Sequence, residues 1–134
     1  MAETEPSEGF SETSSSITFV SPDGNKRIKD YQWLYAGNPL SGYKVWSHVT
    51  GTHKKVGTDW EWDDIKHDNF SVSEKPSYMT VTVTLNGTPV PTMGTTAAEI
   101  SVKCSIEASV IFKGSPFGYP SKDFNRNSPI FYVD

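Results

Sequence analysis

The chain has 134 residues with 12 basic and 16 acidic side chains, a formal net charge of −4. Four of the acids and none of the bases lie within residues 1–16, so the rest of the chain is neutral, which argues against nucleic-acid binding driven by phosphate neutralisation. No segment approaches the roughly 18 consecutive apolar residues of a membrane span, and no basic region precedes an apolar run at the N-terminus, so we expect no membrane insertion, no secretory signal and synthesis in the cytoplasm.

The composition favours β-structure. Val, Ile and Thr together number 31, whereas Leu and Ala number 8. Branched side chains suit a pleated sheet, and the last two residue types favour helices. We therefore predict an all-β fold, a single antiparallel β-sandwich or jelly-roll-like domain over residues 17–134, with an acidic N-terminal arm and an irregular C-terminal arm.

The N-terminal arm, residues 1–16, is rich in Ser and Glu. A segment of this composition cannot bury enough surface to order by itself, so it requires a partner surface. A short strand is expected at 17–20, followed by a tight turn in which Pro22 fixes φ and Gly24 can adopt a positive φ.

Three more strands are expected before residue 66. Residues 26–35 alternate imperfectly, residues 43–50 alternate well, and residues 58–65 place Trp60 and Trp62 on one face with Asp59, Glu61 and Asp63 on the other. Residues 37–42 and 51–57 are expected to be connections, a loop and a polar segment.

Two later segments give the clearest strand signal. Apolar and polar residues alternate over 77–86 and again over 99–113, as in antiparallel strands with one solvated face. Cys104 lies on the apolar side of the second segment and is predicted to be a buried core residue, not a reactive thiol. At about 3.3 Å per residue this strand exceeds 40 Å, so it must bend, bulge or project from the domain.

The remaining segments contain many prolines. Residues 86–97 include Pro89 and Pro91, which cannot donate to a ladder, so an exposed loop or edge is expected there. The C-terminal arm, residues 114–134, is aromatic and is interrupted by three further prolines, with a final short strand expected at 130–133.

The residues that could bind a ligand lie between positions 46 and 63. Trp46, Trp60 and Trp62 could stack on sugar rings or form a protein interface, with hydroxyl groups held by acids that lie on the same predicted strand: Asp59, Glu61 and Asp63. Burial of the tryptophans in the core is the simpler interpretation. We predict no catalytic residues, no metal site and no cofactor.

The alternative chemistries lack specific motifs. The three histidines His48, His53 and His67 do not have the spacing of a known metal site, and no nucleophile elbow or phosphate-binding loop occurs. A small hydrolase using the region of His48, His53 and residues 59–68 is the weakest of three hypotheses.

The leading hypothesis is a non-enzymatic structural subunit that self-assembles or docks on a larger assembly, such as a capsid, decoration or tail protein of a virion. It is favoured by the β-rich core without disulfides, the long strand and the apolar C-terminal arm. Because the extra charge is acidic, an outer or accessory position is expected, without genome contact. A carbohydrate-binding module or lectin is the alternative.

Overall fold

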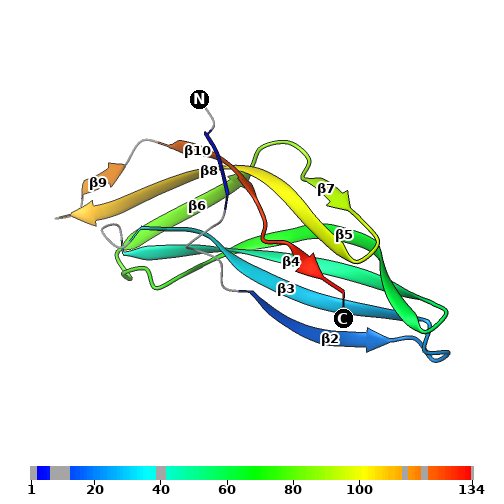
Figure 1. Cartoon of the computed structure of the whole chain (residues 1–134). Coiled ribbons are helices and arrows are strands. Elements are labelled where there is room, and N and C mark those ends of the chain that lie inside the picture. The colour runs from blue at the N-terminus through cyan, green and yellow to red at the C-terminus, as the bar shows by residue number, and fades with distance from the viewer. Residues whose placement is uncertain (1–2, 7–12, 39–41, 113–114, 119–120, 134) are drawn as a thin grey trace.

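The computed structural model describes residues 3–6, 13–38, 42–112, 115–118 and 121–133, and their regular structure is entirely β-strand. Two sheets pack face to face (Figure 1), which confirms the predicted all-β sandwich. Strands that are consecutive in the chain pair as neighbours in the first sheet, so it is a meander. In the described part of the chain no helix is long and apolar enough to span a bilayer.

The first sheet, here the meander sheet, is antiparallel throughout and has the order β2-β3-β4-β5. Its strands are β2 (Ser14–Val20), β3 (Lys26–Asn38), β4 (Tyr43–Val56) and β5 (Asp59–Ser73).

The second sheet is built around β8 (Ala97–Phe112) and is here called the β8 sheet. One side of β8 pairs with β6 (Met79–Leu85) and β7 (Val90–Met93). Its other side pairs with three short strands: β9 (Ser115–Gly118), β10 (Lys122–Asn127) and β11 (Phe131–Tyr132). Strand β1 (Glu3–Pro6) pairs in parallel with β10.

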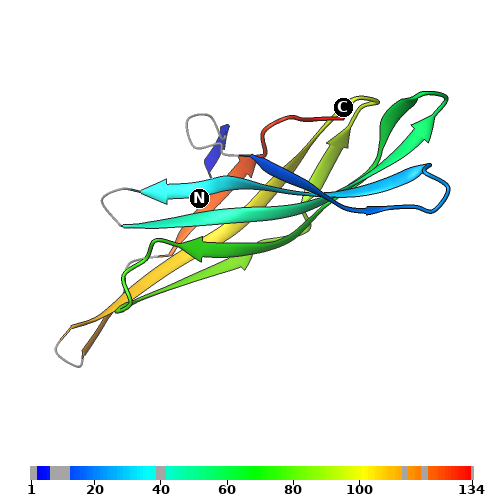
Figure 2. The same cartoon turned by 90° about the horizontal axis from the view of Figure 1, so that it is seen from below.

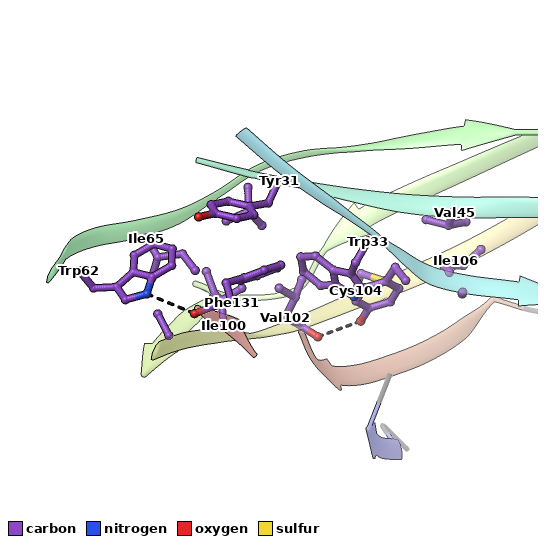
Figure 3. Packing of buried hydrophobic residues seen from close by; sticks show 14 residues of the cluster. Tyr31, Trp33, Val45, Trp62, Ile65, Ile100, Val102, Cys104, Ile106 and Phe131 are labelled. Atoms are coloured by element: carbon purple, nitrogen blue, oxygen red, sulfur yellow. Dashed lines mark hydrogen bonds between the residues drawn. The ribbon is translucent and has the colours of Figure 1, made fainter. Parts of the chain in front are cut away.

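The core lies between the two sheets and consists mainly of aromatic and β-branched side chains (Figure 3). Hydrogen bonds join the layers: the Tyr35 hydroxyl donates to Val102 O at 2.8 Å, and Trp62 Nε1 donates to Phe131 O at 3.2 Å. Cys104 is fully buried, as predicted. The alternation predicted for residues 77–86 is confirmed by the burial pattern of β6, and the alternation predicted for residues 99–113 is confirmed over residues 99–110 of β8. Residue 113 lies outside the described part of the chain.

Strand β5 is longer than predicted because two β-bulges hide its periodicity. Asp63 and Asp68 are the extra residues opposite β4. Each bulge reverses the parity of the residues after it, so the residues that face the core lie three, two, three and two positions apart. They are Trp62, Ile65, His67, Phe70 and Val72. A search for strict alternation therefore ends this strand at residue 65.

Residues 51–57 were predicted to be a polar connection, and this prediction is wrong. Strand β4 continues to Val56, and only Gly57 and Thr58 form the turn. The inward face continues through Gly51 and His53, both buried. Glycine is needed at position 51 because the ring of Trp62 occupies the space where a side chain would lie.

The two terminal arms are more regular than predicted. Strand β2 begins at Ser14 instead of residue 17, and β1 pairs in parallel with β10, so the chain itself supplies a partner for part of the N-terminal arm. Residues 7–12 lie outside the described part, as do residues 39–41 of the predicted loop at 37–42. Strand β10, which the sequence did not predict, pairs with β8 from residue 122 to 127. The final strand is Phe131–Tyr132.

The long strand β8 projects from the body of the molecule. Figure 2 shows its C-terminal end, paired with β9, extending past the meander sheet. The length of this strand required it to bend, bulge or project from the domain, and in the structure it projects. Residues 86–97, predicted to be an exposed loop or edge, include the exposed strand β7, which contains Pro91 and pairs with β8 on one side.

Candidate functional site

The residues predicted to bind a ligand do not converge in the structure. Trp62 is only 4% exposed, and its ring packs against Tyr31 and His53, so it offers no face to a sugar. Trp60 lies on the same inward side, as predicted, but the Arg27 guanidinium covers its ring at 4.4 Å. Trp46 is half-buried on the opposite face, where its Nε1 donates to Ser73 Oγ at 2.7 Å.

The acids predicted to accompany these rings are also dispersed. Asp59 is exposed beside the β4–β5 turn, Glu61 is half-buried, and Asp63 occupies a bulge. Among the described residues, no group of three or more His, Cys, Asp or Glu side chains is arranged to hold a metal ion.

A buried basic cluster, which the sequence did not indicate, lies on the inward face near the β4–β5 turn. Arg27, Lys29 and His53 are all buried. Arg27 Nε donates to His53 Nδ1 at 2.8 Å, so the remaining ring proton is on His53 Nε2, which faces the Tyr31 hydroxyl at 3.3 Å. Because its side chains are buried, the cluster is not accessible to a ligand. It joins β3 to β4 through the Arg27–His53 hydrogen bond, and both strands to β5 through the rings of Trp60 and Trp62.

The side chain of His67 is partly buried on the inward face of β5. Its Nε2 lies 3.1 Å from Ser47 Oγ, and its ring packs on Trp33 and Phe70. Burial lowers the pKa of His67 from 6.5 to about 4. The imidazole is therefore neutral at physiological pH and behaves as part of the apolar layer.

Next to His67 a groove runs between β5 and β6, each of which is an edge strand of its sheet. Its volume is about 410 Å³. Strand β5 contributes residues 67–72, and β6 contributes the apolar side chains Val81, Val83 and Leu85. We call this the β5–β6 groove. Its position could not be derived from sequence, because it depends on how the two sheets are placed relative to one another.

At the opposite edge of the meander sheet, β2 is exposed over its whole length. Ile17, Phe19 and Val20 are 53%, 50% and 49% exposed. The sequence of the strand, SSSITFV, contains no charged residue and no proline. One side of β2 pairs with β3, and no other described strand pairs with its second side.

Natural proteins usually protect such an edge with charges, prolines, strong bulges or a covering segment. The bulge at Thr18 is the single device of this kind within β2. An uncharged apolar edge offers backbone donors and acceptors together with apolar side chains, and is therefore suited to pairing with another strand.

Comparisons with protein-family models, curated proteins and solved structures find no match for this chain. We therefore base the function on the geometry of the chain itself.

Proposed function

We propose that this protein is a non-enzymatic structural subunit that acts by assembling with copies of itself or by docking on a larger assembly, such as a capsid, decoration or tail component of a virion. The observation that carries the proposal is the open edge of β2. Seven consecutive strand residues are exposed there, and none is charged.

Exposed apolar side chains also occur elsewhere on the described surface. Ile130 and Tyr132 at the C-terminus are also exposed and apolar, as are Val90 and Met93 on β7. Scattered single side chains of this kind need no explanation, whereas apolar side chains along an unpaired strand edge offer a template for association. The projecting end of β8 adds a second extended element that a neighbouring subunit could contact.

The charge distribution favours an accessory place in such an assembly. Outside residues 1–16 the acids and bases balance, so the body exerts little long-range attraction on nucleic acid. A subunit on the outside of a shell or tube would not need such attraction.

The test is the dependence of mass on concentration, measured by sedimentation velocity. We expect the wild type to associate and Ile17→Lys to weaken association at least tenfold, because an inward-pointing lysine on an edge opposes strand pairing. Tyr78→Lys is the matched control, since Tyr78 is at least as exposed but precedes β6, and it should associate like the wild type. A wild type that stays monomeric at every concentration, alone and with any co-expressed partner, would refute the proposal.

A second candidate function, carbohydrate binding, rests on Trp46 alone. Its half-buried ring lies on the outer face of the meander sheet, where Nε1 donates to Ser73 Oγ and Ser71 is the residue of β5 opposite Trp46. An aromatic ring beside hydroxyl groups is suited to stacking on a sugar. A glycan array should then show hits that Trp46→Ala removes, and an array with no hits would eliminate this function.

A further inference from the structure

We infer that the subunits join head to tail: β2 of one copy enters the β5–β6 groove of the next and extends its meander sheet. This inference rests on the proposed function and specifies the interface. It concerns the two edges of one sheet, β2 and β5, and requires no other partner.

The strand directions permit this join without turning a subunit over. Strands alternate in direction across the order β2-β3-β4-β5, so β2 and β5 run in opposite directions. A second copy in the same orientation therefore places its β2 antiparallel to β5 of the first. The result is a continuous antiparallel sheet whose inward faces all lie on the same side.

The faces of β2 also match the groove. Ile17 and Val20 pair with Lys29 and Arg27, whose side chains face inward, so these two residues of β2 share the inward side. In the next copy that side is where the β5–β6 groove lies. There Ile17 and Val20 would meet the apolar side chains of β6, and both sets would lose their exposure to water.

The part of β5 that lines the groove is close to β2 in length. The first part of β5 is already occupied, because Trp62 N donates to Thr95 O at 2.9 Å. The groove-lining part, residues 67–72, is six residues long, and β2 has seven.

The charges of the groove do not oppose an uncharged strand. Its single carboxylate belongs to Asp68, which accepts a hydrogen bond from Thr50 Oγ1 and lies 4.0 Å from Lys66 Nζ. Its histidine, His67, is neutral at physiological pH. An incoming β2 therefore leaves no unpartnered charge in the interface.

The experiment uses two variants that each block one side of the join. Ile17→Lys places a charge on the inward side of β2, and Leu85→Lys places a charge in the groove. Both side chains are largely exposed, at 53% and 42%, so folding should be preserved, which is checked by thermal unfolding. Val90→Lys on β7, outside the groove, is the control and should assemble like the wild type.

We expect each variant alone to remain monomeric and an equimolar mixture to form a one-to-one heterodimer that grows no further, because one intact β2 and one intact groove remain between the two copies. If Leu85→Lys assembles alone, β2 pairs with β2 in a symmetric dimer, and the head-to-tail join is refuted while the assembly function stands. If both variants are monomeric and the mixture forms no heterodimer, the two edges do not meet and the inference is also refuted. A wild type that never associates removes the function together with the join.

Discussion

The glycine at position 51 gives a direct test of the packing that holds the two sheets together. A Cβ added there would lie 2.5 Å from Trp62 Cζ3, 2.8 Å from Trp62 Cη2 and 3.0 Å from Tyr31 Cε2. Neither ring can move away easily, because Trp62 is buried and its Nε1 is bonded to Phe131 O across the core. We therefore expect Gly51→Ala to destabilise the fold.

The magnitude follows from the contacts. Overpacking a well-filled core costs about 1–3 kcal/mol, and distances this short place the substitution at the upper end, about 3 kcal/mol. For a domain of this size each kcal/mol lowers the melting temperature by roughly 3–4 °C, so a decrease of about 10 °C is expected. Gly94→Ala is the matched control, since its added Cβ would meet only Ala97 O at 3.4 Å. It should change stability by no more than about 0.5 kcal/mol.

The assay is urea unfolding followed by circular dichroism, in a double-mutant cycle with Trp62→Leu. The leucine removes the ring atoms that clash, so Gly51→Ala should cost less than about 1 kcal/mol in that background, a coupling of about 2 kcal/mol. If the two substitutions are additive, or if Gly51→Ala is neutral in the wild type, the account of glycine at this position is refuted.

Two further predictions concern titratable groups. Because burial lowers the folded-state pKa of His67 to about 4, the unfolded chain binds the extra proton first, and stability should fall as the pH decreases from about 6.5 to about 4. His67 is partly exposed, so solvent reduces the effect, and we expect His67→Gln to remove about 1–2 kcal/mol of this loss of unfolding free energy. The measurement is urea unfolding at a series of pH values. Identical pH profiles for the two proteins would contradict the prediction. Burial also raises the pKa of the Cys104 thiol to about 11, so the native protein should not react with an aromatic disulfide reagent at pH 8, whereas the unfolded protein should react fully. Rapid labelling of the native protein would show that the thiol is accessible.

The part of the fold that the sequence predicted well is the part where alternation is uninterrupted. Strands β6 and β8 have a strict period of two, and the branched and aromatic composition indicated a β-sandwich before any contact was known. Prediction failed where the backbone departs from the ideal ladder: at the bulges of β5, at Gly51 in β4, and in β10, whose polar sequence joins the sheet only because β8 lies beside it.

The features of the candidate site were likewise predictable in part. The sequence by itself determined that the body is neutral, that residues 14–20 are uncharged, and that Trp60 and Trp62 share a face, because these are properties of composition and local period. Only the tertiary structure decided which residues remain accessible. Exposure depends on which strands become the edges of a sheet and on what the opposite layer covers, and both are set by contacts between residues far apart in the chain. That is why the tryptophans of β5 lie beneath other side chains, while β2 and the groove beside β5 lie open.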